Sequence, residues 1–231
     1  MLQDLFDLLF PKTCACCEHF LMPNERSICT HCRNELPLTD PYLENGNETE
    51  KVFYGRVRIV HAISLLQFEK HGITQRLMHD LKYRGNHGIS SELGKWVGND
   101  LLNIPWHKEV EVVIPVPLHR KRLRKRGYNQ VEGFGKNIAE ILNIPYNDRC
   151  LLKIEANKTQ VFKNLAARFQ NVEHSFELNR TETEMLKNKH VLLVDDIITT
   201  GATLETCAQK LLAIPNVKVS IATMARTQRG F

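Results

Sequence analysis

The fold is decided by the stretch 191-VLLVDDIITTGAT-203. Its four leading residues are all apolar, which predicts a strand at 191–194 that is buried on both faces, because a solvated face would bring alternating polar residues. Asp195 and Asp196 follow at the expected end of this strand, and a turn of small residues leads into a helix predicted at 203–212. This order is typical of an α/β sheet in which ligands bind beyond the carboxyl ends of the strands.

The rest of the chain repeats the alternation of apolar strands with amphipathic helices. Helices are expected at 73–81, 89–97 and 129–142, the last with an apolar stripe of Val131, Phe134, Ile138 and Ile141. Strands are expected within 57–68 and at 110–116, 151–154 and 217–224. Uniformly apolar strands that alternate with helices predict a parallel sheet flanked by helices on both faces.

The predicted domain organisation has three parts. Residues 1–36 are expected to form a metal-binding knuckle, 37–106 a linker, strand and helical segment, and 107–231 the main α/β domain. The stretch 34–51 contains Pro37, Pro41 and Gly46 and is expected to be an irregular linker.

The composition excludes several classes of protein. The chain has 231 residues, of which 42% are hydrophobic and 25% charged, so collagen-like, coiled-coil and wholly disordered structures are not expected. No apolar run approaches the roughly 20 residues that span a bilayer. The apolar opening contains Asp4 and Asp7 and lacks the basic flank and cleavage site of a signal peptide. We therefore expect a cytoplasmic protein without membrane insertion.

The residues after the strand at 191–194 have the chemistry of a sugar-phosphate site. Two adjacent carboxylates accept hydrogen bonds from a vicinal diol or hold a divalent cation. Small and hydroxylic residues at the start of a helix let backbone N–H groups converge on one anion; here they are Thr199, Thr200, Gly201, Ala202 and Thr203. Together the two halves predict a ribose 5-phosphate site.

Three competing interpretations of this stretch fit less well. A Walker loop requires G-x-x-x-x-G-K-[ST], which is absent here. A phosphorelay receiver requires an aspartate on a later strand, and no aspartate follows Asp196. An acidic helix cap explains one aspartate but not the thirteen-residue pattern.

The cysteines predict a structural zinc site. Five of the seven lie within the first 32 residues, and the pairs Cys14-x-x-Cys17 and Cys29-x-x-Cys32 have the spacing of two zinc knuckles. A site with four thiolates leaves no position for water, and the metal would supply most of the folding energy of so small a unit. Whether Cys16, His19 or His31 replaces one of the four ligands is left open by the sequence.

A basic block at 119–126, HRKRLRKR, suggests a polyanionic partner. Tyr128 follows the block and Tyr83 lies in the similar cluster Lys82-Tyr83-Arg84. Cations interleaved with aromatic rings are typical of surfaces that bind single-stranded nucleic acid. The alternatives are a solvated basic face and a role in binding pyrophosphate.

The stretch 191–203 resembles the signature of type I phosphoribosyltransferases, which bind 5-phosphoribosyl-1-pyrophosphate (PRPP). The order of the other motifs resembles the ComF (ComFC/GntX) family. These motifs are the four-cysteine knuckle, Leu81-Lys82-Tyr83, PVPLH at 115–119, RGYNQ at 126–130, Thr159-Gln160, Arg168 and Asn171. The resemblance implies a type I phosphoribosyltransferase-like fold with a small N-terminal zinc knuckle.

The resemblance also implies roles for single residues. Asp195 and Asp196 would contact the ribose hydroxyls, and 199–203 would hold the 5-phosphate. The turn of Val116, Pro117 and Leu118 would match the pyrophosphate loop. Residues 159–171 would match the flexible hood, which would contribute Arg168 as a catalytic residue. Magnesium would accompany PRPP.

The family is linked to natural transformation. The resemblance therefore implies a role in DNA uptake, handling single-stranded DNA at the cytoplasmic face of the inner membrane, with a DNA-uptake helicase or a membrane channel protein as candidate partners. The alternative is an active phosphoribosyltransferase of nucleotide salvage or metabolism, whose acceptor the sequence does not define.

Overall fold

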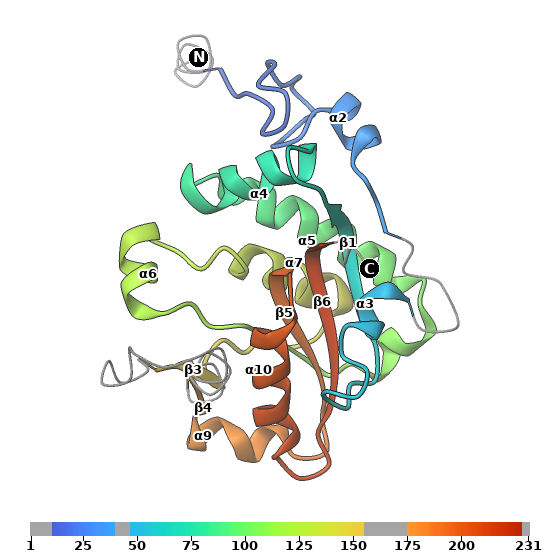
Figure 1. Cartoon of the computed structure of the whole chain (residues 1–231), viewed down its shortest axis with the longest axis vertical. Helices are drawn as coiled ribbons and strands as arrows, with labels where there is room; N and C mark the ends of the chain where they lie inside the picture. Colours follow the sequence, from blue (N-terminus) through green and yellow to red (C-terminus); the bar gives the residue numbers. More distant parts are fainter. Residues whose placement is uncertain (1–10, 40–46, 155–174, 228–231) are drawn as a thin grey trace.

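The computed structural model describes residues 11–39, 47–154 and 175–227 and contains a central four-stranded parallel sheet (Figure 1). The strand order is β1 (Ala62–Phe68), β6 (Lys218–Thr227), β5 (His190–Ile198) and β2 (Val112–Pro115). Its two middle strands, β5 and β6, pair in parallel over most of their length. The sheet confirms the predicted parallel α/β architecture.

Strand β5 continues past the point where the sequence predicted its end. Asp195 pairs in register with Thr223, and Ile197 with Ala225, so the strand runs on through the acidic pair to Ile198. The long partner β6 supplies hydrogen bonds for these extra residues. Since successive strand residues face opposite sides of a sheet, the Asp195 and Asp196 side chains point to opposite faces.

Helices cover both faces of the sheet. Helices α4 (Ile73–Tyr83), α5 (His87–Leu102) and α7 (Glu132–Leu142) share one hydrophobic core with Leu192 and Val194 of β5. Helix α10 (Ala202–Leu212) shares the other core with Val191 and Leu193. The alternating side chains of β5 therefore serve both cores.

Helices α5 and α7 approach each other closely at a glycine. A Cβ atom at Gly94 would lie 2.5 Å from the carbonyl oxygen of Phe134, so no larger residue fits there without a shift. Phe134 and Ile138 are completely buried in this contact layer. The predicted apolar stripe of α7 is thus the face that packs, and another stripe residue, Ile141, lies against Gly98 of α5.

The sequence placed a domain boundary at residue 107, but the sheet crosses it. Strand β1 belongs to the 37–106 segment and pairs in parallel with β6, so this segment supplies an edge strand of the main sheet. Part of the expected linker is also structured: α3 (Glu48–Lys51) begins after Asn47, whose side chain accepts hydrogen bonds from Thr49 and Glu50.

Strand β3 (Leu151–Lys153) was predicted among the strands of the parallel sheet and does not join it. It pairs antiparallel with β4 (Phe176–Leu178) in a separate two-stranded sheet. The remaining helices are short: α2 (Thr30–Glu35), η1 (Pro105–Glu109), α6 (Arg120–Arg126), α9 (Arg180–Thr183) and η3 (Glu184–Leu186).

The N-terminal cysteine region docks on the helices at one end of the sheet (Figure 1). Cys14, Ala15 and Ile28 belong to the same hydrophobic cluster as Leu77 and Leu81 of α4. The backbone N–H of Ser27 also donates to Glu92 of α5 at 3.1 Å. Among the described residues, no helix combines the length and the apolar character needed to cross a bilayer.

Candidate functional site

The four cysteines of the two knuckles converge. The Sγ atoms of Cys14, Cys17, Cys29 and Cys32 all lie within 4.8 Å of one another, and those of Cys17 and Cys29 are 3.8 Å apart. A zinc ion with bonds of about 2.3 Å to sulfur places its tetrahedral ligands roughly 3.8 Å apart, so this set fits zinc. Because all four positions are thiolates, the site is structural.

Backbone N–H groups hold the thiolates in place. Cys16 and Cys29 donate to the Sγ atom of Cys14 at 3.4 and 3.3 Å, and Cys32 donates to that of Cys29 at 3.4 Å. The three alternative ligands lie outside the group of four. Cys16 is buried without joining it, His19 is exposed, and His31 lies 3.4 Å from Glu35.

Asp196 is already held by two side chains from distant segments. Its Oδ2 atom lies 2.8 Å from the Lys82 ammonium and accepts a hydrogen bond of 2.9 Å from the Gln130 amide. Its Oδ1 atom accepts from the N–H of Ile197 at 2.6 Å. The Asp196 side chain is only 12% exposed, so these contacts fix its direction.

Asp195 has a different environment on the other face of the sheet. Its Oδ1 atom accepts from the N–H of Asp196 at 2.8 Å. Burial and the neighbouring Asp196 carboxylate raise the pKa of Asp195 to about 7, against the opposing effect of Lys82 and Lys153. The two acids are therefore not equivalent: Asp196 forms an ion pair with Lys82, whereas Asp195, with its pKa of about 7, changes charge near neutral pH.

The loop at 199–203 turns sharply into α10. Gly201 has a φ of +77°, a left-handed conformation that favours glycine, and the helix begins at the next residue, one earlier than predicted. Thr199 and Thr200 are exposed just before it. A helix N-terminus preceded by such a turn presents unpaired N–H groups to an anion.

Arg56 fastens this loop to the segment before β1. Its guanidinium donates to the carbonyl oxygen of Thr200 at 2.5 Å and to that of Val52 at 3.1 Å, and it forms an ion pair with Glu205 in the first turn of α10. Arg56 thus joins three elements around the candidate phosphate loop.

The turn after β2 is anchored at Val116. Its N–H donates to the carbonyl oxygen of Val194 at 2.9 Å, and its own carbonyl oxygen accepts from the Asn129 amide at 3.2 Å. Pro117 and Leu118 are half-buried and line a cavity of about 610 Å³. The acidic pair and the 199–203 loop are not part of the lining of this cavity.

Four residues around the acidic pair and its loop had no predicted role in a sugar-phosphate site. Lys82 and Gln130 lie in the motifs Leu81-Lys82-Tyr83 and RGYNQ, so a signal was present, but nothing in the sequence indicated that both reach Asp196. Arg56 and Lys153 carried no signal. Arg168 and the rest of the expected hood at 159–171 lie outside the described residues.

The basic block forms helix α6. The His119 side chain accepts from the N–H of Lys121 at its start, and Gly127 ends it with a φ of +79°. Within the described part of the chain, Arg120, Arg122, Arg124 and Arg126 make no ion pair.

The two tyrosines beside the basic block, Tyr128 and Tyr83, differ in their exposure to solvent. The hydroxyl of Tyr128 donates to the carbonyl oxygen of Leu81, and its ring lies 3.7 Å from that of His87, so it is a half-buried packing residue. Tyr83 is 69% exposed, and the guanidinium of Arg126 lies 5.6 Å from its ring centre.

Comparisons with known protein families agree with this description. A phosphoribosyl transferase domain matches residues 132–230, and a double zinc ribbon domain matches residues 5–43. The chain is similar to solved structures of an allosteric regulatory enzyme of purine biosynthesis, at 25% identity over 58% of this chain and 25% of that one, with a TM-score of 0.38. It is also similar to glutamine PRPP amidotransferase from B. subtilis, at 23% identity over 63% and 30% of the two chains, with a TM-score of 0.42.

Three curated relatives have names that refer to DNA or competence. Competence protein F of Haemophilus influenzae is 27% identical over 86% of this chain and 84% of its own length. DNA utilization protein YhgH of Escherichia coli K12 is 26% identical over 65% of this chain and 66% of its own length. Competence protein ComFC of Bacillus subtilis is 24% identical over 84% and 81%, respectively. With its type I phosphoribosyltransferase fold and its N-terminal zinc ribbon, the chain belongs to the ComF family.

Proposed function

We propose that the carboxyl end of β5 binds PRPP. The observation that carries the proposal is the direct succession of the acidic pair, the left-handed turn at Gly201 and the start of α10. The carboxylates of Asp195 and Asp196 accept hydrogen bonds from the ribose hydroxyls, and Lys82 and Gln130 hold Asp196 in position. The N–H groups and hydroxyls of 199–203 bind the 5-phosphate.

The pyrophosphate of PRPP is assigned to the turn of Val116, Pro117 and Leu118. This turn is anchored to β5, so it lies next to the strand that bears the acidic pair. Mg²⁺ prefers oxygen ligands and, bound together with PRPP, would neutralise the charge of the pyrophosphate. Arg168 remains a candidate catalytic residue from the hood.

Calorimetry with PRPP and Mg²⁺ tests this site on the zinc-loaded chain. We expect heat of binding from the unmodified protein and none from the double variant Asp195→Asn/Asp196→Asn. Glu184→Gln changes an exposed carboxylate on η3 and serves as the matched control. Absence of heat with the unmodified chain would refute the proposal.

We infer that this PRPP-binding protein acts in DNA uptake and handles single-stranded DNA at the cytoplasmic face of the inner membrane. Two relatives are named competence proteins and the third a DNA utilization protein, which supports a role in DNA uptake. The arginines of α6 without ion-pair partners in the described part of the chain support contact with a polyanion. A DNA-uptake helicase or a membrane channel protein is the expected partner.

Two measurements test this role. Affinity for oligo-dT should fall with rising salt, since each neutralised phosphate of a single strand contributes about 0.7 to the logarithmic slope. In cells, loss of the protein should lower transformation, and the chain with Asp195→Asn/Asp196→Asn should fail to restore it. Full restoration by this variant would separate transformation from the PRPP site.

A second candidate function is catalytic transfer of the phosphoribosyl group. The cavity beside the 116–118 turn favours it, because its lining combines apolar side chains, such as Leu151, with polar groups, such as Asn129, as small-molecule sites do. Release of pyrophosphate from PRPP, measured with a panel of nucleobases and amines, distinguishes an enzyme from a protein that only binds PRPP.

A further inference from the structure

Two segments far apart in the sequence meet on one surface. Arg76, His79 and Tyr83 lie at positions i, i+3 and i+7 of α4 and therefore on one face of that helix. The His79 and Tyr83 rings are 4.9 Å apart, and Arg126 at the end of α6 stands over the Tyr83 ring at 5.6 Å. We call these four residues the α4–α6 strip.

The strip is open to a ligand at its aromatic centre. Tyr83 is 69% exposed, and the His79 side chain 59%. Arg126 already shows that the face of the tyrosine ring accepts a flat cationic group. A planar base can stack on the same ring, because every base presents a π-face.

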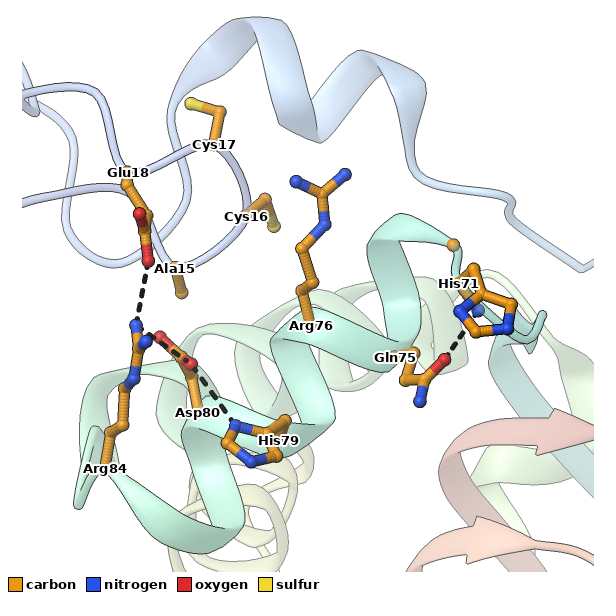
Figure 2. Close-up of a pocket in the computed structure, with 11 residues that line it drawn as sticks. Ala15, Cys16, Cys17, Glu18, His71, Gln75, Arg76, His79, Asp80 and Arg84 are labelled. Atoms are coloured by element: carbon orange, nitrogen blue, oxygen red, sulfur yellow. Dashed lines mark hydrogen bonds and ion pairs between the residues drawn. The ribbon is translucent and has the colours of Figure 1, made fainter.

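Arg76 extends the strip toward the zinc ribbon. It points from α4 toward Cys16 and Cys17 of the first cysteine knuckle across a cavity of about 500 Å³ (Figure 2). The other arginine of this cavity, Arg84, is paired with Glu18 at 3.0 Å and with Asp80 at 3.5 Å. Arg76 makes no hydrogen bond or ion pair through its side chain within the described part of the chain, so its guanidinium is available.

We propose that the α4–α6 strip is the docking track for single-stranded nucleic acid, with a base stacked on Tyr83 and phosphates bound by Arg76 and Arg126. The proposal rests on the nucleic-acid role inferred above and gives it a place on the molecule. The rise of α4 from Arg76 to Tyr83 is about 10 Å, so Arg76 contacts the strand at a point separate from the Tyr83 ring and from Arg126 beside it. A duplex, whose bases are already stacked on one another, cannot use such a platform.

Anisotropy of a labelled oligo-dT with the full, zinc-loaded chain tests the aromatic contact. Loss of a base–aromatic stack costs about 1–3 kcal/mol, so Tyr83→Ala should weaken binding by about 5- to 160-fold, whereas Tyr83→Phe should retain it. Tyr54→Ala removes a tyrosine that is 60% exposed elsewhere and should have no effect. The heat of PRPP binding should be unchanged in Tyr83→Ala, which also shows that this variant is folded.

The contacts of Arg76 and Arg126 with phosphates are tested by the salt dependence of oligo-dT binding. Arg76→Ala and Arg126→Ala should each lower the salt slope by about 0.7, whereas Arg180→Ala, at an exposed arginine of α9, should leave it unchanged. A four-thiolate zinc site is negatively charged, so the competing role for Arg76 is to neutralise it. Loss of zinc from Arg76→Ala with an unchanged salt slope would overturn the assignment of this residue.

The outcomes separate the two levels of the proposal. If the unmodified chain fails to bind oligo-dT, the nucleic-acid role itself is refuted. If it binds and Tyr83→Ala and Arg126→Ala bind equally well, the role stands and the strip is the wrong surface. If polyglutamate competes as well as oligo-dT and depends equally on Tyr83, the strip recognises an acidic protein, and the proposal is wrong.

Discussion

Replacing Gly201 with alanine probes how closely the candidate phosphate loop is held against the segment before β1. The residue has a φ of +77°, and adopting this conformation costs a non-glycine residue about 1–2 kcal/mol. A Cβ atom there would also lie 2.8 Å from Cγ1 of Val52 and 3.3 Å from Cε1 of Phe53. Overpacking against buried neighbours costs about 1–3 kcal/mol, so Gly201→Ala should destabilise the protein by about 2–5 kcal/mol.

Gly85→Ala provides the matched control. Gly85 has a φ of +69°, but a Cβ atom there would meet nothing within 4 Å. Gly85→Ala should therefore lower the free energy of unfolding only by the cost of the left-handed backbone conformation, about 1–2 kcal/mol. Urea unfolding of both zinc-loaded variants measures the difference, provided that the slope of the transition is unchanged. Equal midpoints for the two variants would refute the close packing of the loop, and retained PRPP heat in Gly201→Ala would refute its role as the phosphate site.

Three further results are expected. Cys32→Ser should lose bound zinc and Cys16→Ser should keep it, as measured by metal content after dialysis, and the reverse would contradict the four-cysteine assignment. Lys82→Met should lower the free energy of unfolding in urea by about 3 kcal/mol, because it leaves the buried Asp196 carboxylate without its cation; an unchanged midpoint would show that the pair contributes nothing. The raised pKa of Asp195 means that the folded protein holds this proton longer than the unfolded chain, so between about pH 4 and pH 7 this group lowers the stability as the pH rises. Urea midpoints across that interval should fall more steeply for the unmodified chain than for Asp195→Asn, and parallel curves would exclude the effect.

The parts of the fold that depend on local pattern were predictable. Four consecutive apolar residues at 191–194 are buried on both faces of the sheet, and the stripe of α7 packs as its spacing indicates. Within each cysteine knuckle, the short spacing already brings the two thiols into one turn. In each case the signal lies within a few residues, so neighbours in the sequence are also neighbours in space.

The contacts around the acidic pair were not predictable in the same way. Lys82 and Gln130 come from segments more than 60 residues before Asp196, and Arg56 reaches Thr200 from a segment still further away. Nothing in the local sequence of these residues indicates which partner they meet. The different environments of Asp195 and Asp196 arise because β5 continues through both and turns them to opposite faces.

The sequence by itself determined that this chain has a parallel α/β sheet, a four-cysteine zinc ribbon and a loop with the residues of a sugar-phosphate site. Only the tertiary structure decided that β1 joins the same sheet as an edge strand, that Asp196 is held by Lys82 and Gln130, and that Tyr83 rather than Tyr128 is exposed beside the basic helix. The reason is physical. Periodicity and spacing record which residue types a local structure needs, whereas burial, ion pairing and charge state depend on groups that only folding brings within contact distance.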